Sequence, residues 1–362
     1  MFKVKPLLLA LLVAILAVSA VWINYLLSQG GAYRDLAYHG GESCTKLNGY
    51  VGAEDIVIDQ ARRVAYISSD DRRAAFNGDA VAGNVYALPL DDLQAAPKPL
   101  PIALDSFHPH GIDLWVGADG RRRLMVVNHA GENDERIEIF DLTQNALSLD
   151  HVRTVRDTRI HSPNDVAAVG PEQFYFTNDN GSTSQFQRLA ELLQLTGRAN
   201  LVYFDGTQGR VEQSGFLLAN GVGAHPDGKT LVMTEFYGQT LWLFDRDPAT
   251  GKLSGRDAIH LPTHLDNINF DSTGAIWIGA QPNSIAMLGH AMDAERLSPS
   301  QVLRITLNEG APGGKVDETY LNDGAQLSAA SVAAPYTAAD GSARVLVGAI
   351  FDGHILDCPA TE

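Results

Sequence analysis

The chain has 362 residues, of which 45% are hydrophobic and 19% charged, an ordinary globular composition with ample apolar material for a core. Its 43 acidic and 27 basic side chains give a formal net charge of −16, which excludes nucleic acid and anionic lipid headgroups as favoured partners. An acidic protein suits the binding of a hard cation, although acidity alone can also serve only solubility.

An uncharged apolar segment covers residues 7–27 and follows Lys3 and Lys5. Basic residues ahead of an apolar run orient the following chain to the non-cytoplasmic side of a membrane. At helical rise the run is long enough to cross a hydrocarbon core of about 30 Å. The sequence therefore predicts an exported chain whose folded part lies in a periplasmic or extracellular compartment.

Two features bear on whether this segment is kept. Residues 18–20, Val-Ser-Ala, would suit a signal peptidase, which would release a secreted protein. The apolar run nevertheless continues to Leu27, and Trp22 and Tyr25 stand where interfacial anchors are placed. We therefore expect a retained signal-anchor helix, with the membrane as a partner, and treat cleavage as the alternative.

Strand-like runs rich in β-branched and aromatic residues recur six times along the rest of the chain. These runs cover 64–69, 124–129, 174–179, 231–236, 275–280 and 345–350. Each is followed by a second strand-like run and preceded, across a turn, by a shorter segment. Sets of strands repeating at a spacing of roughly 50 residues predict an all-β fold, a six-bladed β-propeller. Two β-sandwiches, the alternative, would not share one internal pattern.

Two longer insertions interrupt the repeat. Residues 183–197 read as a short amphipathic helix ended by Gly197, and residues 283–297 indicate another helix. Insertions on one face of a propeller can cover the mouth of an active site, or they can simply pack.

The two cysteines, Cys44 and Cys358, lie at opposite ends of the repeats. In an exported chain such a pair predicts a disulfide, here a clasp on a closed ring, whereas two free buried thiols are the alternative. For so long a loop the chain-entropy model gives on the order of 5 kcal/mol as an upper value. The expected organisation is an anchor (1–27), a linker (28–43), the propeller (44–358) and a short tail (359–362).

Polar residues precede five of the six apolar runs at nearly the same repeat position. They are Glu54 and Asp55, His108 and His110, Asn164 and Asp165, Asn220, and Asp266 with Asn267. Because the first strand of each blade lines the central channel, these side chains should converge on one axial point. Crowded acids and amides need a positive group between them. Oxygen donors without thiolates favour calcium, although Asx turns would explain any one of these residues alone.

At these residues the sequence resembles the paraoxonase/arylesterase family, from about Gly41 to Cys358. The supporting strings include GAEDIVID, SFHPHGID, LMVVNHA, PNDVAAVGPEQFYFTND and LDNINFD, and the sugar-lactone hydrolases are more distant kin. The resemblance implies two calcium ions and a histidine pair. The ligands that the resemblance implies for a catalytic ion are Glu54, Asn164, Asn220, Asp266 and Asn267. For a structural ion it implies Asp55, Asp165 and the backbone carbonyl of Ile112. The histidine pair that it implies is His110 and His129.

Three departures from the family pattern concern the substrate cavity. Leu218 stands where better-known members have an aromatic residue, and Ala280-Gln281 stands where they have Cys-His. The insertion at 183–197 is also hard to align. Substrate preference is therefore the property that the resemblance transfers least well.

The expected chemistry is calcium-dependent hydrolysis of carboxylic esters, foremost lactones and aryl esters. An ion with an open position would polarise the carbonyl, and His110 would activate water while His129 orients His110 or relays the proton. No G-x-S-x-G sequence competes, although an axial carboxylate acting as nucleophile is an alternative.

Two other functions stay open at the level of the sequence. A sugar-lactone hydrolase should have a polar cavity, whereas Phe107, Phe186, Leu217 and Leu218 indicate an apolar one. A non-catalytic binding propeller that uses calcium only for rigidity would not need His110.

Overall fold

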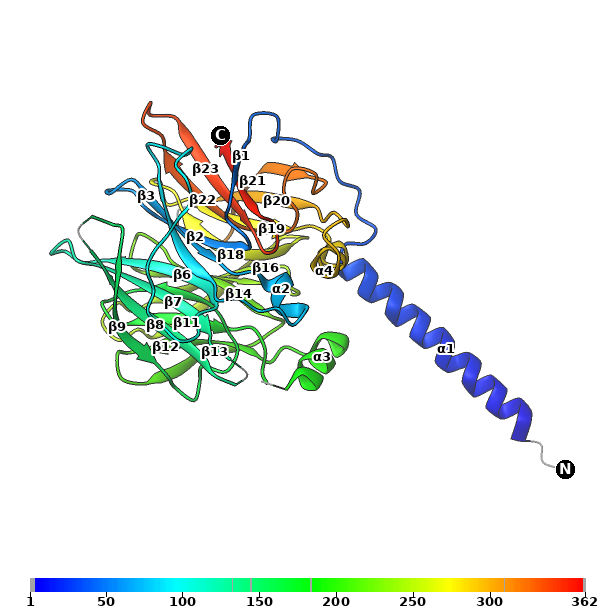
Figure 1. The fold of residues 1–362 in the computed structure, drawn as a ribbon. Helices are drawn as coiled ribbons and strands as arrows, with labels where there is room; N and C mark the ends of the chain where they lie inside the picture. The colour runs from blue at the N-terminus through cyan, green and yellow to red at the C-terminus, as the bar shows by residue number, and fades with distance from the viewer. Residues whose placement is uncertain (1–3, 132, 144, 183, 309, 361–362) are drawn as a thin grey trace.

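The computed structural model describes residues 4–131, 133–143, 145–182, 184–308 and 310–360. Its strands form six four-stranded antiparallel sheets arranged as blades around one axis, which confirms the six-bladed propeller (Figure 1). Each innermost strand contacts the innermost strands of the two neighbouring blades, so the ring is closed.

The blades are given from the axis outward. Blade one holds β2 (Ala53–Asp59), β3 (Val64–Ser69), β4 (Asn84–Pro89) and β5 (Lys98–Pro99). Blade two holds β6 (Pro109–Val116), β7 (Arg122–His129), β8 (Glu135–Leu142) and β9 (Leu149–Val155). Blade three holds β10 (Pro163–Ala168), β11 (Phe174–Asn178), β12 (Ala199–Phe204) and β13 (Gly209–Phe216).

The second half of the ring repeats this order. Blade four holds β14 (Ala219–Ala224), β15 (Thr230–Glu235), β16 (Thr240–Arg246) and β17 (Leu253–His260). Blade five holds β18 (His264–Phe270), β19 (Ile276–Gln281), β20 (Ser300–Leu307) and β21 (Gly314–Asn322). Blade six holds β22 (Ala330–Thr337), β23 (Ala343–Ala349), β24 (His354–Pro359) and β1 (Thr45–Asn48).

The hydrophobic core is divided into layers between successive blades. The second strands of the blades carry apolar residues on both faces, and every residue of β3, β11 and β19 is buried. Between blades two and three, for example, Met125 and Val127 pack against Phe174 and Phe176. A blade buried on both sides needs apolar residues at consecutive positions, and the six strand-like runs of the sequence have that pattern.

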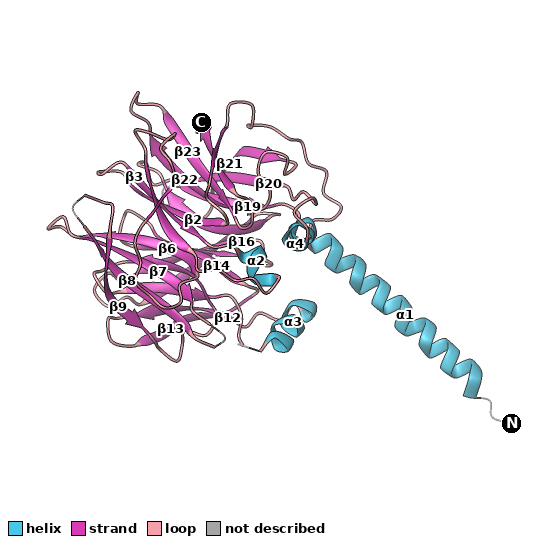
Figure 2. Ribbon diagram, in the orientation of Figure 1, coloured by secondary structure: helices cyan, strands magenta, loops and turns pink. Residues whose placement is uncertain are grey.

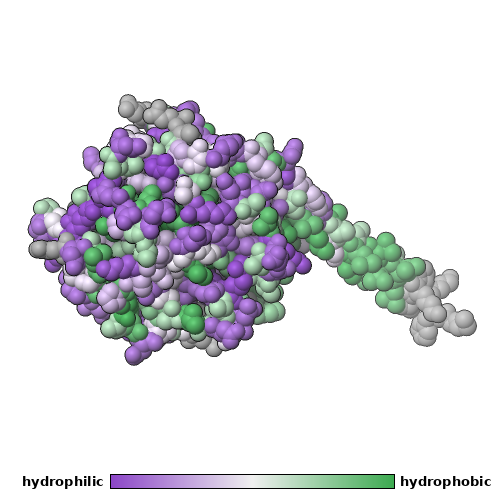
Figure 3. All heavy atoms as spheres, turned by 45° about the horizontal axis from the view of Figure 1, so that its top comes forward, coloured by the Kyte–Doolittle hydropathy of each residue, from purple (hydrophilic) through white to green (hydrophobic). Residues whose placement is uncertain are grey.

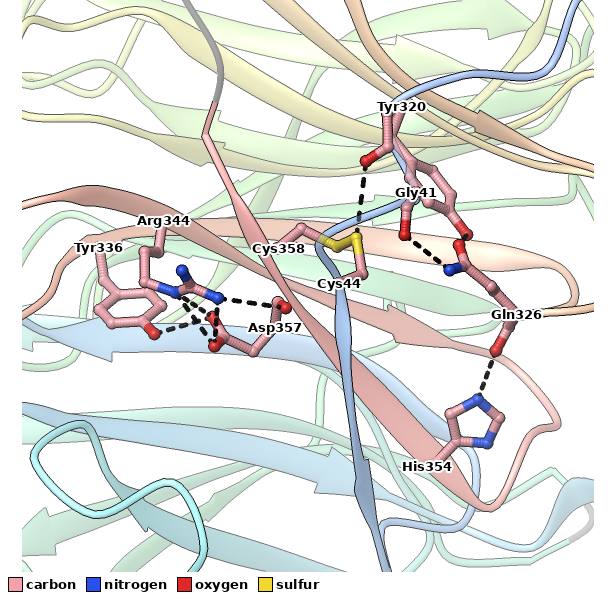
Figure 4. The surroundings of a disulfide bond; sticks show 10 residues. Gly41, Cys44, Tyr320, Gln326, Tyr336, Arg344, His354, Asp357 and Cys358 are labelled. Atoms are coloured by element: carbon pink, nitrogen blue, oxygen red, sulfur yellow. Dashed lines mark hydrogen bonds and ion pairs between the residues drawn. A yellow bond between two sulfur atoms is a disulfide. The ribbon is translucent and has the colours of Figure 1, made fainter.

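The sixth blade contains both ends of the propeller. Strand β1 pairs antiparallel with β24, with Thr45 opposite Asp357 and Asn48 opposite His354. The predicted Cys44–Cys358 disulfide is present beside this pairing (Figure 4). Within this blade, Arg344 of β23 donates hydrogen bonds to Asp357 of β24, which holds the strand that pairs with β1.

In the described part of the chain, four helices are added to the propeller: α1 (Val4–Gln29), α2 (Arg72–Phe76), α3 (Gln185–Gln194) and α4 (Ser284–Met292) (Figure 2). Helices α3 and α4 confirm the two predicted helical insertions. The predicted end of α3 at Gly197 is wrong, because the chain leaves the helix through Leu195 in a left-handed conformation, with φ at 50°. Helix α2 was not predicted.

Helix α1 carries an apolar stretch, Leu8–Gln29, long enough to cross a membrane. In Figure 3 it leaves a largely hydrophilic body as an apolar rod. Its inner end is fixed to the propeller, because the carbonyl of Gly30 accepts from Ser284 N at 2.9 Å and the carbonyl of Gln29 accepts from Gln239 Nε2 at 2.9 Å. Together with the disulfide, this helix indicates an exported chain.

Candidate functional site

A β-bulge at the start of each inner strand builds the axial site. In blade one, Ala53 faces Ser69 and Asp55 faces Ser68, so Glu54 is an extra residue with no partner in β3. The same one-residue shift occurs at the corresponding point of the other five inner strands. Bulges redirect side chains away from the alternation of the strand. This local geometry explains why polar residues at one repeat position point to one place.

The five residues expected to hold a catalytic ion lie together and are all buried: Glu54, Asn164, Asn220, Asp266 and Asn267. Asn267 Nδ2 donates to Glu54 Oε1 at 2.8 Å, which joins blades five and one across the axis. The side chain of Asn220 lies within hydrogen-bonding reach of Asp266. The axial convergence that the sequence repeat predicts is therefore present.

The oxygen atoms of this cluster lack donors. Glu54 Oε2 and the Oδ1 atoms of Asn164, Asn220 and Asn267 are buried, and no described residue gives any of them a hydrogen bond. Burying an unpaired acceptor costs about 1–3 kcal/mol, so four in one place indicate that a positive group binds there. As metal ligands, these two carboxylates and three amides fit a hard cation such as calcium, which binds oxygen atoms.

The crowding of buried carboxylates at the axis also indicates that a positive group binds there. Burial, together with the charge of Glu54, raises the pKa of Asp266 well above its usual value. Burial would also raise the pKa of Glu54, but His110 and Arg72 outweigh it and lower that pKa. Among the described residues no three His, Cys, Asp or Glu side chains group as metal ligands, and amides supply most of the donors at this site.

The two aspartates expected to hold a structural ion lie one residue further along their strands. Asp55 accepts from the backbone N–H of Ile112 at 2.7 Å, and Asp165 accepts from that of Val222 at 2.7 Å. Burial and neighbouring carboxylates raise the pKa of both aspartates well above the usual value. Gly111 lets the backbone of β6 lie close to Asp165, since a Cβ at Gly111 would lie 2.3 Å from Asp165 Oδ1.

This geometry places the peptide of Ile112 beside Asp55. Two buried carboxylates with raised pKa values fit a second cation between them. The carbonyl of Ile112 as a ligand stays a prediction.

The two histidines singled out in the sequence are in contact. His110 Nδ1 lies 2.8 Å from His129 Nε2, and His110 Nε2 lies 3.3 Å from Glu54 Oε1. Burial lowers the pKa of His110 below its usual value, which favours a neutral ring able to accept a proton. His110 therefore borders the axial cluster on one side and His129 on the other.

Two further residues at the site are not predicted from the sequence as functional groups. Glu135 Oε2 lies 2.5 Å from His129 Nδ1. Arg72, on α2, donates to the carbonyls of Gly52 and Pro109 and lies near Glu54 and His110. These residues occur once rather than in every blade, so the repeat could not reveal them; the pairing of β7 with β8 was the only available signal for Glu135.

Gln281, noted in the sequence as a departure from the family, supports the axial cluster directly. Its Nε2 donates to Asp266 Oδ2 at 2.6 Å and to the carbonyl of Ala330 at 3.0 Å. Two acceptors on one side fix the orientation of the amide. The side chain is fully buried, so Gln281 holds the Asp266 carboxylate in one position.

A cavity of about 490 Å³ opens above the cluster. Its floor includes Glu54, His110 and Asp266, and its walls are mostly apolar: Phe76, Leu218, Phe236, Tyr237, Met287, Leu288, Ala291, Met292, Ile350 and Phe351. Helices α2 and α4 thus form part of the mouth, so of the two roles left open for the insertion at 283–297 the structure shows the first.

The sequence predicts an apolar cavity from four residues, Phe107, Phe186, Leu217 and Leu218. Of these four, only Leu218 lines this cavity. Leu217 borders a neighbouring cavity of about 200 Å³ under α3. The predictions for Phe107 and Phe186 are wrong: Phe107 packs in the core between blades one and two, and Phe186 is 80% exposed on α3. An apolar cavity is confirmed, but other residues build it.

Comparison with known proteins agrees with this geometry. The family model for arylesterases matches residues 51–358. Serum paraoxonase/arylesterase 1 of Rattus norvegicus is 30% identical over 331 residues, which cover 88% of this chain and 90% of the rat protein. Serum paraoxonase/lactonase 3 of Oryctolagus cuniculus is 29% identical over 355 residues, covering 96% and 97%.

Among solved structures, regucalcin of Agrobacterium tumefaciens, described as a calcium-binding protein, superposes with a TM-score of 0.52 at 14% identity. The match covers 89% of this chain and 95% of regucalcin, and at this identity it supports the fold alone. The family match over nearly the whole propeller, together with the relatives of similar length, shows that the chain belongs to the arylesterase family.

Proposed function

We propose that this protein is a calcium-dependent hydrolase of lactones and aryl esters that works at the axial site. The observation that carries the proposal is the group of buried oxygen atoms without donors beside a histidine pair, at the floor of an apolar cavity. Calcium bound there would supply a positive charge that polarises the substrate carbonyl and stabilises the oxyanion. Relatives named arylesterase and lactonase support this substrate class.

We propose that Glu54, Asn164, Asn220, Asp266 and Asn267 hold this ion and that Asp55, Asp165 and the Ile112 carbonyl hold a second, structural ion. Asn267 and Gln281 orient the two carboxylates through the hydrogen bonds described above. The raised pKa of Asp55 supports the second site, because a cation would relieve the repulsion.

His110 would act as the general base. Its Nε2 faces the axial cluster, where a water molecule can lose a proton to it as the water attacks the carbonyl carbon. His129 supports the ring from behind at 2.8 Å. The apolar walls exclude bulk water and favour apolar substrates, so the cavity suits a sugar lactone less well.

The test is a pair of histidine variants. His110→Gln should lower hydrolysis of a lactone and an aryl ester by about 10²–10⁴-fold, the usual loss for a general base. It should leave calcium affinity nearly unchanged, because His110 is not a proposed ligand. His225→Gln, at a ring bonded to the carbonyl of Gly274 away from the site, is the matched control. Full activity of His110→Gln, or activity unaffected by chelator, would contradict the proposal.

We also propose that α1 is retained as a membrane anchor and that the propeller lies on the non-cytoplasmic side. The apolar stretch of α1 and its fixed inner end support this. Fractionation of cells expressing the full chain should find it in the membrane after an alkaline wash. Release of a shorter chain into the soluble fraction would instead show cleavage.

A further inference from the structure

A carboxylate stands at the outer end of the histidine pair. Glu135 is the first residue of β8 and lies directly opposite His129 of β7 in the antiparallel register. Its Oε2 is 2.5 Å from His129 Nδ1, and its side chain is only 15% exposed. We propose that Glu135 is a positioning residue that sets the tautomer of His129 and, through it, that of His110, and that stabilises the positive charge that turnover places on His129. This inference rests on the proposed function of the axial site.

The donors and acceptors in these hydrogen bonds determine which ring nitrogen of each histidine carries the proton. An ionised carboxylate can only accept, so His129 must carry its proton on Nδ1. A neutral His129 then has a lone pair on Nε2, which accepts from His110 Nδ1–H at 2.8 Å. His110 is thereby left with its lone pair on Nε2, on the side of the axial cluster, as a general base requires.

A second carboxylate competes for the opposite arrangement. Glu54 Oε1 lies 3.3 Å from His110 Nε2 and would favour a proton on that atom. The Glu135 contact is shorter by a wide margin, and Glu54 Oε1 already accepts from Asn267 at 2.8 Å. Glu135 therefore decides the tautomer, and without it the base would be blocked by its own proton.

The same arrangement gives the released proton an exit. Hydrolysis of an ester at neutral pH ends in a carboxylate and one free proton. When His110 Nε2 takes a proton from water, His110 Nδ1–H can pass to His129 Nε2, so the positive charge appears on His129. There it lies against Glu135 rather than beside Arg72 and the axial cluster.

Exposure to water follows the same direction. The side chain of His110 is 18% exposed and that of His129 is 34% exposed, so the outer ring can hand the proton to solvent. Charge and exposure together lead the proton outward from the site.

Two substitutions separate orientation from charge. The side chain of Glu135→Gln can still accept from His129 Nδ1–H but carries no charge, whereas Glu135→Leu can do neither. Both should lower kcat, by about 10–100-fold, with little change in KM or in the stabilisation by calcium, and Leu should lower it more. Asp134→Asn is the control, because this neighbouring carboxylate pairs with Arg136 and Arg156 instead of a histidine and should keep full kcat.

Nitrogen NMR of the histidine rings in the full chain, in detergent micelles at about pH 8 where a free imidazole is neutral, provides the second readout. Wild type and Glu135→Gln should show His129 protonated on Nδ1, with its signal assigned by loss in His129→Gln, while Glu135→Leu should lose that preference. Wild-type kcat in both variants, or a His129 protonated on Nε2 in wild type, would overturn the proposal. If wild type hydrolyses neither ester nor lactone, the proposed function fails, and the ring spectra still decide whether Glu135 sets the tautomer.

Discussion

At the scale of single residues, the axial site depends on side chains that hold other side chains. The amide of Gln281 fixes the Asp266 carboxylate at 2.6 Å and is itself fixed by the carbonyl of Ala330. Buried carboxylates that face a cation need such donors, because a freely rotating group would lose entropy on binding. The position of Asp266 is therefore a property of blade six as well as of blade five.

We expect Gln281→Leu to weaken calcium binding by about tenfold, since outer hydrogen bonds to ligands typically contribute 10–100-fold in metal affinity. A calcium titration followed by calorimetry measures this. Gln301→Leu removes another buried amide, one that contacts Thr263 and Glu318, and should leave calcium affinity intact. Equal calcium affinity in wild type and Gln281→Leu would show that Asp266 binds calcium equally well without the hydrogen bond from Gln281.

Residues that recur are visible in the sequence, and residues that occur once are not. Glu54, Asn164 and Asp266 could be placed on the axis because each stands at the same position of a repeat. Glu135 and Gln281 contact the site from second strands or their neighbours, where nothing repeats. Their roles depend on strand register and side-chain direction, which the sequence does not determine by pattern alone.

At the scale of elements, aspartate side chains link one inner strand to the next. Asp113 in β6 accepts from the backbone N–H of Ala168 in β10 at 2.7 Å and from Leu114 N at 2.7 Å. Asp55 and Asp165 make the same two contacts, one within the strand and one to the following blade. The inner strands are thus joined by side chains where no sheet ladder connects them.

Replacing Asp113 should loosen one such link. We expect Asp113→Ala to lower the free energy of unfolding by about 1 kcal/mol, because a half-buried N–H loses its acceptor. Calcium affinity should stay near the wild-type value, since Asp113 is not a proposed ligand. Denaturant unfolding measures the first and a calcium titration the second, with Asp119→Ala in an exposed turn as the control. A stability loss no larger than that of Asp119→Ala would refute the link.

Helices α2 and α4 are tied together at the mouth of the cavity. Arg73 of α2 donates to the carbonyl of His290 in α4 at 3.0 Å, and His290 Nε2 lies 3.1 Å from Asp352 Oδ1. Burial alone would raise the pKa of Asp352, but the hydrogen bonds from His290 and from Ser328 N outweigh it and lower that pKa. The position of the wall residues therefore depends on one ionised carboxylate.

The depressed pKa of Asp352 gives a pH prediction with a definite sign. The ionised group stabilises the fold above its unfolded pKa of about 3.9, and this contribution is lost as pH falls through the lower folded value. The stability advantage of wild type over Asp352→Asn should be constant near neutral pH and shrink below about pH 4. The titratable side chains that face Asp352 are His290 and His354. The measurement is the melting temperature of both proteins from neutral to acid pH. A stability advantage of wild type over Asp352→Asn that grows as pH falls would contradict this prediction.

Short elements were the hardest to predict. Helix α2 has five residues, and its start depends on Asp71, whose side chain accepts from Ala74 N at 2.9 Å. The residues 70–76 contain no apolar period long enough to indicate a helix. Helix α3 ended three residues before the expected glycine because Leu195 adopts the left-handed conformation that glycine usually supplies.

At the scale of the whole molecule, the ring is closed by one strand pairing and one covalent bond. The disulfide joins residues 314 positions apart, so it constrains nearly the entire propeller. We expect the double variant Cys44→Ser, Cys358→Ser to lose stability, with on the order of 5 kcal/mol as the upper value from chain entropy. Turnover of the folded fraction should change little, because the bond lies at the outer edge of blade six. Thermal unfolding with and without reductant measures the effect, and an unchanged melting temperature would show that β1 and β24 close the ring unaided.

The division of blade six between β1 and β24 also sets the order in which the enzyme can be made. Strand β1 is among the first parts of the propeller to be synthesised, and β24 is the last. Five blades can form while the chain is still emerging, but β1 has no partner until residue 354 has been synthesised. Ser331 in β22 of blade six donates to the carbonyl of Glu54, so the axial site is also incomplete until blade six has begun to form. A chain arrested before blade six would therefore leave β1 unpaired and lack a finished site.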